Sequence, residues 1–186
     1  MVTGWQPGKP IFLLGHSMGG GIAAYYLLDH QDDFAGAILS APTIKVGDKV
    51  TNGTIFMAKV LSKLAPKAGV MAVDPEGVSK DPAVVQAYIH DPLVHHGKVT
   101  ARLGAELLTG MMRITAEVGK ISLPFIVVQG GDDVLVDPVG AKMLYEQASS
   151  ADKTIRFYEG LHHEVFNEPE REIALQDVGN WLEAHL

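Results

Sequence analysis

The sequence contains no cysteine among its 186 residues. That absence excludes disulfide bonds, thiolate nucleophiles and cysteine-ligated metal sites. Basic residues are also scarce, because 15 Lys and Arg stand against 22 Asp and Glu, for a formal net charge of −7. A nucleic-acid binder needs Lys and Arg concentrated on one face, so we expect no nucleic-acid partner. No apolar run reaches the roughly 18 residues that a membrane-spanning helix requires.

The length and composition are those of a folded globular protein. At roughly 150 residues per domain, the chain is long enough for about one domain. Hydrophobic residues make up 47% of it and charged residues 20%, which excludes an intrinsically disordered chain. Residues 1–7 have no basic stretch followed by an apolar segment, so they do not resemble a signal peptide. We therefore expect a cytoplasmic location.

Short apolar runs alternate with amphipathic segments along much of the chain. The runs expected as strands are 11–14, 35–40, 125–129 and 154–158. The segments expected as helices are 18–30, 138–149 and 169 to the C-terminus. In the first of these helices, Ile22, Ala23, Tyr26 and Leu27 recur on one face. This alternation predicts an α/β fold with a mainly parallel sheet of about four strands and helices on both faces.

One long segment lacks a strand pattern. Between residues 41 and 123 we find only helical patterns, chiefly in 53–65 and 100–118. We interpret 41–123 as a helical cap inserted over the carboxyl edge of the sheet. The remaining parts are then 1–40, with the first strands, and 124–186, with the last ones.

The segment from Gly15 to Gly19 matches the pattern G-x-S-x-G between a predicted strand and a predicted helix. In that context the two glycines allow a sharp turn that exposes the Ser17 hydroxyl. The backbone N–H of Met18 then faces the same space and can bind an oxyanion. The alternative is that Ser17 only caps the helix.

A serine nucleophile needs a base and an orienting acid, and both residue types follow the later strands. Asp132 and Asp133 come after the third predicted strand, and His162 and His163 come after the fourth. The chain order Ser, Asp, His is that of α/β hydrolases, in which such side chains converge at the carboxyl ends of the strands. Ser17 is thus predicted to be the nucleophile of a triad.

Several alternatives remain open on the residues alone. Asp132 and Asp137 could each be turn formers, since turn chemistry alone explains an Asp after two glycines. At most one of two adjacent histidines can serve as the base. The pair His95 and His96 has no acid at a useful spacing, so we assign it to the surface of the cap. No cluster of residues indicates a metal site, and the chemistry needs no cofactor.

Four segments in order resemble the monoacylglycerol lipase and lysophospholipase branch of the α/β hydrolases. They are PIFLLGHSMGGGIAA, AYIHDPLV, PFIVVQGGDDVLVDP and YEGLHHEVFNE. The family pattern Q-G-x-x-D selects Asp133 over Asp132, and G-x-x-H selects His163 over His162. The resemblance implies hydrolysis of monoacylglycerols or similar short- and medium-chain acyl esters by the triad Ser17, Asp133 and His163.

The resemblance also implies a substrate-binding role for His16 and Tyr88, which would help to hold the glycerol moiety. His16 has a second interpretation, as a hydrogen-bonded support for the turn at Ser17. An acyl pocket lined by cap residues is expected to include Leu107, Leu108, Met111 and Met112. Segment 53–65 sets Ile55, Phe56, Val60 and Leu64 against Lys59 and Lys63. It is either a lid that packs on the core or a helix that touches lipid.

The chain departs from the family pattern at its beginning. Family members carry a longer portion before the nucleophile strand, with an H-G-x-G type loop that supplies a second oxyanion N–H. Residues 1–10 contain no such motif, so we expect slow hydrolysis, since one lost donor costs about 10²–10³ in kcat. The alternative is a weakly active or inactive self-associating remnant. Strand 11–14 becomes an apolar sheet edge, which predicts a homo-oligomer.

Overall fold

The computed structural model describes residues 8–47 and 50–186. Residues 1–7, for which we expected neither a signal peptide nor an oxyanion loop, lie outside the described residues. Four parallel strands form the main sheet in the order β1-β2-β5-β6. Their bounds are β1 Phe12–His16, β2 Gly36–Ser40, β5 Phe125–Gly130 and β6 Lys153–Tyr158. The predicted parallel sheet of about four strands is confirmed.

Each central strand sends alternate side chains to the two faces of the sheet. Leu39 and Val127 join one apolar core, whereas Ile38 and Val128 join the other. This is the period of two that an extended strand imposes, and both faces are apolar because both are covered. The sheet therefore separates two apolar cores, one on each face. Its central strands, β2 and β5, are buried along their whole lengths.

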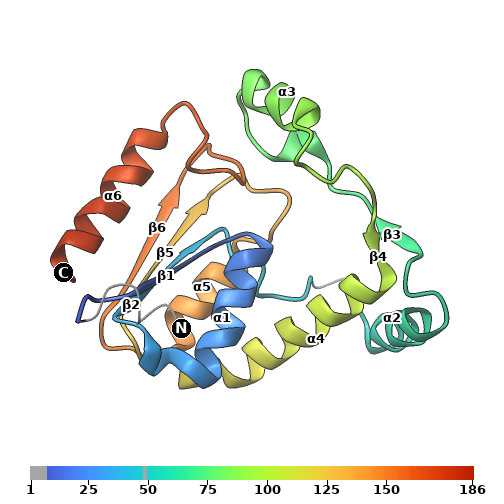
Figure 1. The fold of residues 1–186 in the computed structure, drawn as a ribbon, viewed down its shortest axis with the longest axis horizontal. Helices are drawn as coiled ribbons and strands as arrows, with labels where there is room; N and C mark the ends of the chain where they lie inside the picture. The colour runs from blue at the N-terminus through green and yellow to red at the C-terminus, as the bar shows by residue number, and fades with distance from the viewer. Residues whose placement is uncertain (1–7, 48–49) are drawn as a thin grey trace.

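Helices cover both faces, as Figure 1 shows. α1 (Met18–His30) and α5 (Val139–Gln147) lie on one face, and α6 (Arg171–Ala184) lies on the other. Trp181 of α6 is 7% exposed and packs edge-on against Phe12 of β1, with ring centroids 5.9 Å apart. The three predicted helices are confirmed, with ends that shift by a few residues.

The elements between β2 and β5 are α2 (Asn52–Leu64), β3 (Gly69–Met71), α3 (Pro82–His90), β4 (Val99–Thr100) and α4 (Ala101–Glu117). Short 3₁₀ helices occur at Gln31–Asp33, Pro75–Gly77 and Val118–Lys120. β3 and β4 pair as an antiparallel ribbon, so the expectation that 41–123 contains only helices was wrong. β3 is exposed and has a register shift, which leaves no alternating pattern in the sequence.

Helix α2 begins where Thr51 Oγ1 accepts a hydrogen bond from the backbone N–H of Thr54. Several of its apolar side chains remain in solvent, since Phe56 is 65% exposed and Leu64 81%. Ile55 and Val60 are only half-buried. The apolar stripe is thus not fully packed on the core as a closed lid would be. Within the described ranges, no helix is long and apolar enough to cross a membrane.

Candidate active site

Ser17 lies at the sharp turn between β1 and α1. Its φ of 54°, with a ψ of −122°, is a positive value that non-glycine residues rarely adopt. The turn is held by the backbone, because Ser17 N donates to Ser40 O at 2.9 Å and Thr43 N donates to Ser17 O at 3.0 Å. Ser17 occupies the N-cap position, yet its side chain makes no capping hydrogen bond. The interpretation of Ser17 as a helix cap therefore finds no support.

The two glycines of the motif differ in what surrounds them. A Cβ on Gly15 would meet the carbonyl oxygen of Gly19 and would lie 2.9 Å from Cβ of Ala23. A Cβ on Gly19 would meet no heavy atom within 4 Å, and Gly19 does not have a positive φ. At Gly19, therefore, neither the neighbouring atoms nor the backbone φ requires a glycine. The close approach of α1 to β1 demands a glycine at Gly15.

Asp133 follows β5, and its carboxylate is buried and fully hydrogen-bonded. Oδ2 accepts from His163 Nδ1 and from Gln129 Nε2, each at 2.8 Å. Oδ1 accepts from the backbone N–H groups of Leu135 and Val136 at 2.9 and 3.0 Å. Burial by itself raises the pKa of Asp133, but these hydrogen bonds outweigh it, and the pKa lies below its ordinary value. The side chain is therefore an anion at neutral pH.

His163 lies in the loop after β6 and is 4% exposed. Because Nδ1 donates to Asp133, Nε2 is left with its lone pair, as a general base requires. The alternative residues, Asp132 and His162, do not form such a pair. Asp132 is exposed, and His162 is linked instead to Glu168, which accepts from its backbone N–H at 2.8 Å. The structure thus brings together Asp133 and His163.

The His16 ring lies beside the His163 ring, with centroids 4.9 Å apart. Both of its nitrogens have protein partners, since Nδ1 is 3.0 Å from Ser40 Oγ and Nε2 is 3.1 Å from Glu164 Oε1. Burial raises the pKa of Glu164, but hydrogen bonds from His16 and Asn167 outweigh it, and the pKa lies below the usual range. These contacts favour the interpretation of His16 as a support for the turn.

Tyr88 lies in α3 and lines a cavity of about 560 Å³ together with Glu164, Asn167 and Arg171. Its ring meets His96 edge-on at 5.9 Å. Glu164 is the residue that connects the two predicted substrate-binding positions, because it bonds to His16 and lines the same cavity as Tyr88.

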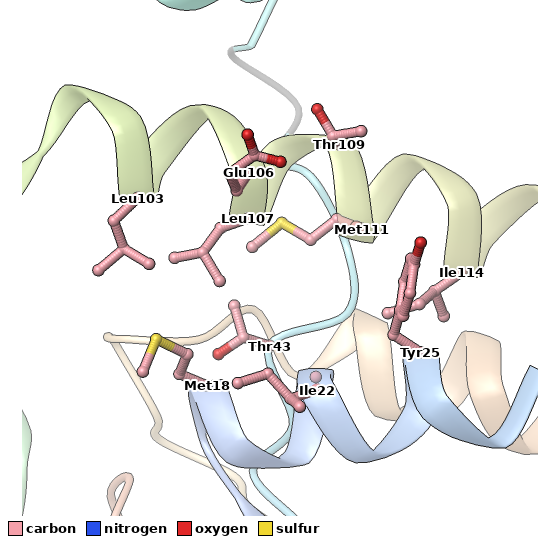
Figure 2. Close-up of a pocket in the computed structure, with 12 residues that line it drawn as sticks. Met18, Ile22, Tyr25, Thr43, Leu103, Glu106, Leu107, Thr109, Met111 and Ile114 are labelled. Atoms are coloured by element: carbon pink, nitrogen blue, oxygen red, sulfur yellow. The ribbon is translucent and has the colours of Figure 1, made fainter. Parts of the chain in front are cut away.

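A second cavity, of about 410 Å³, lies between α1 and α4 (Figure 2). Met18, the residue after Ser17, lines one end of it. The predicted pocket residues Leu107 and Met111 line it as well, whereas Leu108 and Met112 do not. Ile22 is 58% exposed and lines this cavity. The lining is mostly apolar, which suits a hydrocarbon chain.

Three residues near the site went unrecognised in the sequence: Gln129, Glu164 and Glu168. Glu168 is completely buried and accepts from Ser79 Oγ and from the backbone N–H groups of Lys80 and His162. It ties the loop of His163 to the segment that leads into α3. The segment VFNEPE carries no local signal for this role, because the partners of Glu168 are distant in sequence. Among the residues that the structure describes, no group of three or more His, Asp or Glu side chains is placed to share a metal ion.

Comparison with protein families and curated sequences gives consistent matches. The family model for serine aminopeptidase, S33, matches residues 1–170. The chain is 39% identical over 181 residues to the monoacylglycerol lipase of Mycolicibacterium smegmatis. This match covers 97% of this chain and 65% of that protein. Human monoglyceride lipase is 36% identical over 179 residues, covering 95% of this chain and 59% of that protein. The chain therefore spans less than two thirds of the length of these relatives.

Solved structures of monoacylglycerol and monoglyceride lipases are also similar to this chain. The monoacylglycerol lipase of Paleococcus ferrophilus superposes with a TM-score of 0.87 at 32% identity, covering 96% of this chain and 70% of that one. A soluble variant of the Saccharomyces cerevisiae monoglyceride lipase, in complex with a substrate analogue, superposes with a TM-score of 0.83 at 27% identity. That match covers 96% of this chain and 63% of the yeast one.

Proposed function

The chain belongs to the serine aminopeptidase S33 family of α/β hydrolases, and from that premise we propose that it hydrolyses monoacylglycerols or similar short- and medium-chain acyl esters. The observation that carries the proposal is the hydrogen bond between His163 Nδ1 and the buried carboxylate of Asp133. It lies near the turn at Ser17, because the ring of the adjacent His16 contacts the His163 ring. The names of the relatives supply the substrate class.

In the proposed reaction Ser17 Oγ attacks the ester carbonyl carbon while His163 Nε2 takes the hydroxyl proton. The Asp133 carboxylate keeps His163 in the required tautomer and stabilises the imidazolium. The tetrahedral oxyanion accepts a hydrogen bond from the backbone N–H of Met18, because the first N–H groups of a helix have no partner within it. His163 then gives the proton to the leaving alcohol, and water hydrolyses the acyl-enzyme by the same steps in reverse order.

The two cavities suit the two halves of such a substrate. The apolar cavity begins at Met18, next to Ser17, and would hold the acyl chain. The cavity lined by Tyr88 and Glu164 is more polar and would receive the alcohol, whose hydroxyls pair with carboxylate and phenol groups. A lysophospholipid would bring a phosphate toward the Glu164 carboxylate, so we rank it below a neutral glyceride.

The exposed side of α2 is proposed to contact lipid. Phe56, Met57 and Leu64 leave apolar surface in solvent, and Lys59 and Lys63 accompany them on the same helix. Interfacial helices combine apolar and basic residues in this way. Binding to anionic phospholipid vesicles should therefore weaken in a Phe56→Ser, Leu64→Ser double variant, while hydrolysis of a dissolved ester should not change.

We also propose self-association through β1. Among the described strands, β1 pairs with β2 alone and forms an edge of the sheet, with Leu14 58% exposed. An apolar edge without a blunting charge or proline favours pairing with another copy. Light scattering at micromolar concentration should give the mass of a dimer or larger species, and a monodisperse monomer would refute this part of the proposal.

A fluorophosphonate probe tests the active site itself. It phosphonylates an activated serine, and peptide mapping by mass spectrometry should find the label on Ser17. Labelling should disappear in Ser17→Ala and slow strongly in His163→Ala. A label on another serine, or an equal rate in His163→Ala, would contradict the assigned roles.

A further inference from the structure

The apolar cavity runs along matching faces of two helices. From α1 it is lined by Met18, Ile22 and Tyr25, which recur at helical spacing, and α4 faces them with Leu103 and Ile114 at its two ends. Figure 2 shows Met18 and Leu103 together at one end, and Tyr25 and Ile114 together at the other. The cavity thus begins beside the serine turn and extends along α1.

The length of that path is limited. Seven residues separate Met18 from Tyr25, which at 1.5 Å per residue is about 10 Å along the helix axis. Such a length accommodates a short or medium acyl chain and falls short of an extended long one. The end at Tyr25 therefore decides how much of a chain the cavity can take.

Tyr25 is held against α4 at this end. A Cβ on Gly110 would make an ordinary van der Waals contact with the Tyr25 ring at 3.8 Å, so the ring lies beside α4 at this position. The guanidinium carbon of Arg113 lies over the same ring, 4.7 Å from its centroid. Two nitrogens of Arg113 bind the two carboxylate oxygens of Asp29 at 2.9 and 2.7 Å, and Arg113 also bonds to Glu117.

The apolar cavity therefore ends at the Tyr25 ring, and the charged side chains of Arg113 and Asp29 lie behind that ring. A longer chain would have to push Tyr25 aside and bring methylene groups against a bidentate ion pair. We propose that Tyr25, held in place by Arg113 and Asp29, sets the upper limit of acyl-chain length. This inference rests on the proposed ester hydrolysis at Ser17, since it places the acyl chain in the cavity beside Met18.

The chain offers a matched pair of tyrosines for the test. Tyr26 follows Tyr25 on α1 and is similarly exposed, but it packs on His30 and Phe34 and does not line the cavity. We would measure kcat/KM for p-nitrophenyl octanoate and palmitate in the wild type, Tyr25→Ala, Tyr25→Phe and Tyr26→Ala. Tyr25→Ala should raise the palmitate-to-octanoate ratio about tenfold or more, because removing bulk from an apolar pocket admits added methylenes. Tyr25→Phe and Tyr26→Ala should keep the wild-type ratio.

A binding measurement separates this inference from the proposed reaction. Octanoic and palmitic acids would displace a fluorescent fatty acid from Ser17→Ala and from the Ser17→Ala, Tyr25→Ala double variant, where no ester is cleaved. The added Tyr25→Ala change should favour palmitic acid over octanoic acid by a similar factor. If both ratios are unchanged by Tyr25→Ala, the inference is wrong even where hydrolysis occurs. If no ester is cleaved but the binding ratio shifts, the reaction fails and the length limit stands.

Discussion

His163 Nδ1 and Asp133 Oδ2 lie 2.8 Å apart, although 30 residues separate them in the sequence. The two side chains come from loops that follow neighbouring parallel strands, β5 and β6. A Cβ on Gly130, the last residue of β5, would meet the carbonyl oxygens of His162 and Leu161. Close packing at that glycine is what allows the second loop to reach the first.

Replacing Asp133 by Asn should lower kcat by about 10⁴, because the amide favours the wrong tautomer of the base. The neighbouring Asp132→Asn is the matched control, since Asp132 is exposed. It should retain nearly full activity. Steady-state hydrolysis of p-nitrophenyl butyrate, with thermal melting to verify folding, would decide the matter. If Asp133→Asn kept as high a kcat as Asp132→Asn, the hydrogen bond to His163 would have no catalytic role.

Stability should fall in acid because of Asp133 and Glu164. Burial raises the pKa of each carboxyl, but the hydrogen bonds from His163 and His16 and their neighbours outweigh it, so both folded-state pKa values are lowered. The stability that these groups contribute is present above about pH 4, the unfolded value, and is lost as pH falls through the folded values. Urea denaturation at a series of pH values would measure the decline. The decline in unfolding free energy with falling pH should be shallower in Glu164→Gln than in the wild type. An equally steep decline in both proteins would contradict this explanation.

The two glycines of the serine turn should respond in opposite ways to alanine. Gly15→Ala places a Cβ against the backbone of Gly19, and overpacking of this kind costs about 1–3 kcal/mol of unfolding free energy. Gly19→Ala meets open space within α1, and alanine there should stabilise the helix by up to about 1 kcal/mol. Chemical denaturation of the two variants provides the comparison. A destabilised Gly19→Ala would mean that the turn needs flexibility there.

Removal of the Glu168 carboxylate should destabilise the fold by roughly 2–4 kcal/mol, because the buried Ser79 hydroxyl and the part-buried backbone N–H groups of Lys80 and His162 would lose their acceptor. Glu170→Ala removes an exposed carboxylate two residues away that pairs with Lys80 Nζ at 2.8 Å. This control should change the unfolding free energy little, because an ion pair exposed to solvent contributes little to stability. If Glu168→Ala costs no more than the control, the donors must find other partners.

The sequence predicted the parts of the fold whose local pattern agrees with their surroundings. β5 is a continuous β-branched run because both of its faces are buried, and α1 follows the glycine motif directly. The β3–β4 ribbon escaped prediction because its pairing joins residues far apart, such as Gly69 and Thr100, and because β3 is exposed. Strands that bury no face leave no periodic signal.

Residues of the candidate site could be predicted only where they belong to a recognisable sequence motif. Ser17 has a recognisable local context, but the choices between Asp132 and Asp133 and between His162 and His163 depended on a family resemblance. Glu164 gave no such signal, because its bond to His16 spans 148 residues. Long-range hydrogen bonds become visible only once the strands are placed in order.

The most direct test of the account is hydrolysis of p-nitrophenyl butyrate by the 186-residue chain beside its Ser17→Ala variant. We predict measurable turnover in the wild type and a loss of at least about 10³-fold in the variant, which keeps the fold but has no nucleophile. Thermal melting should confirm that both proteins are folded. Equal rates in the two proteins would contradict the account, because Ser17 would then take no part in ester cleavage.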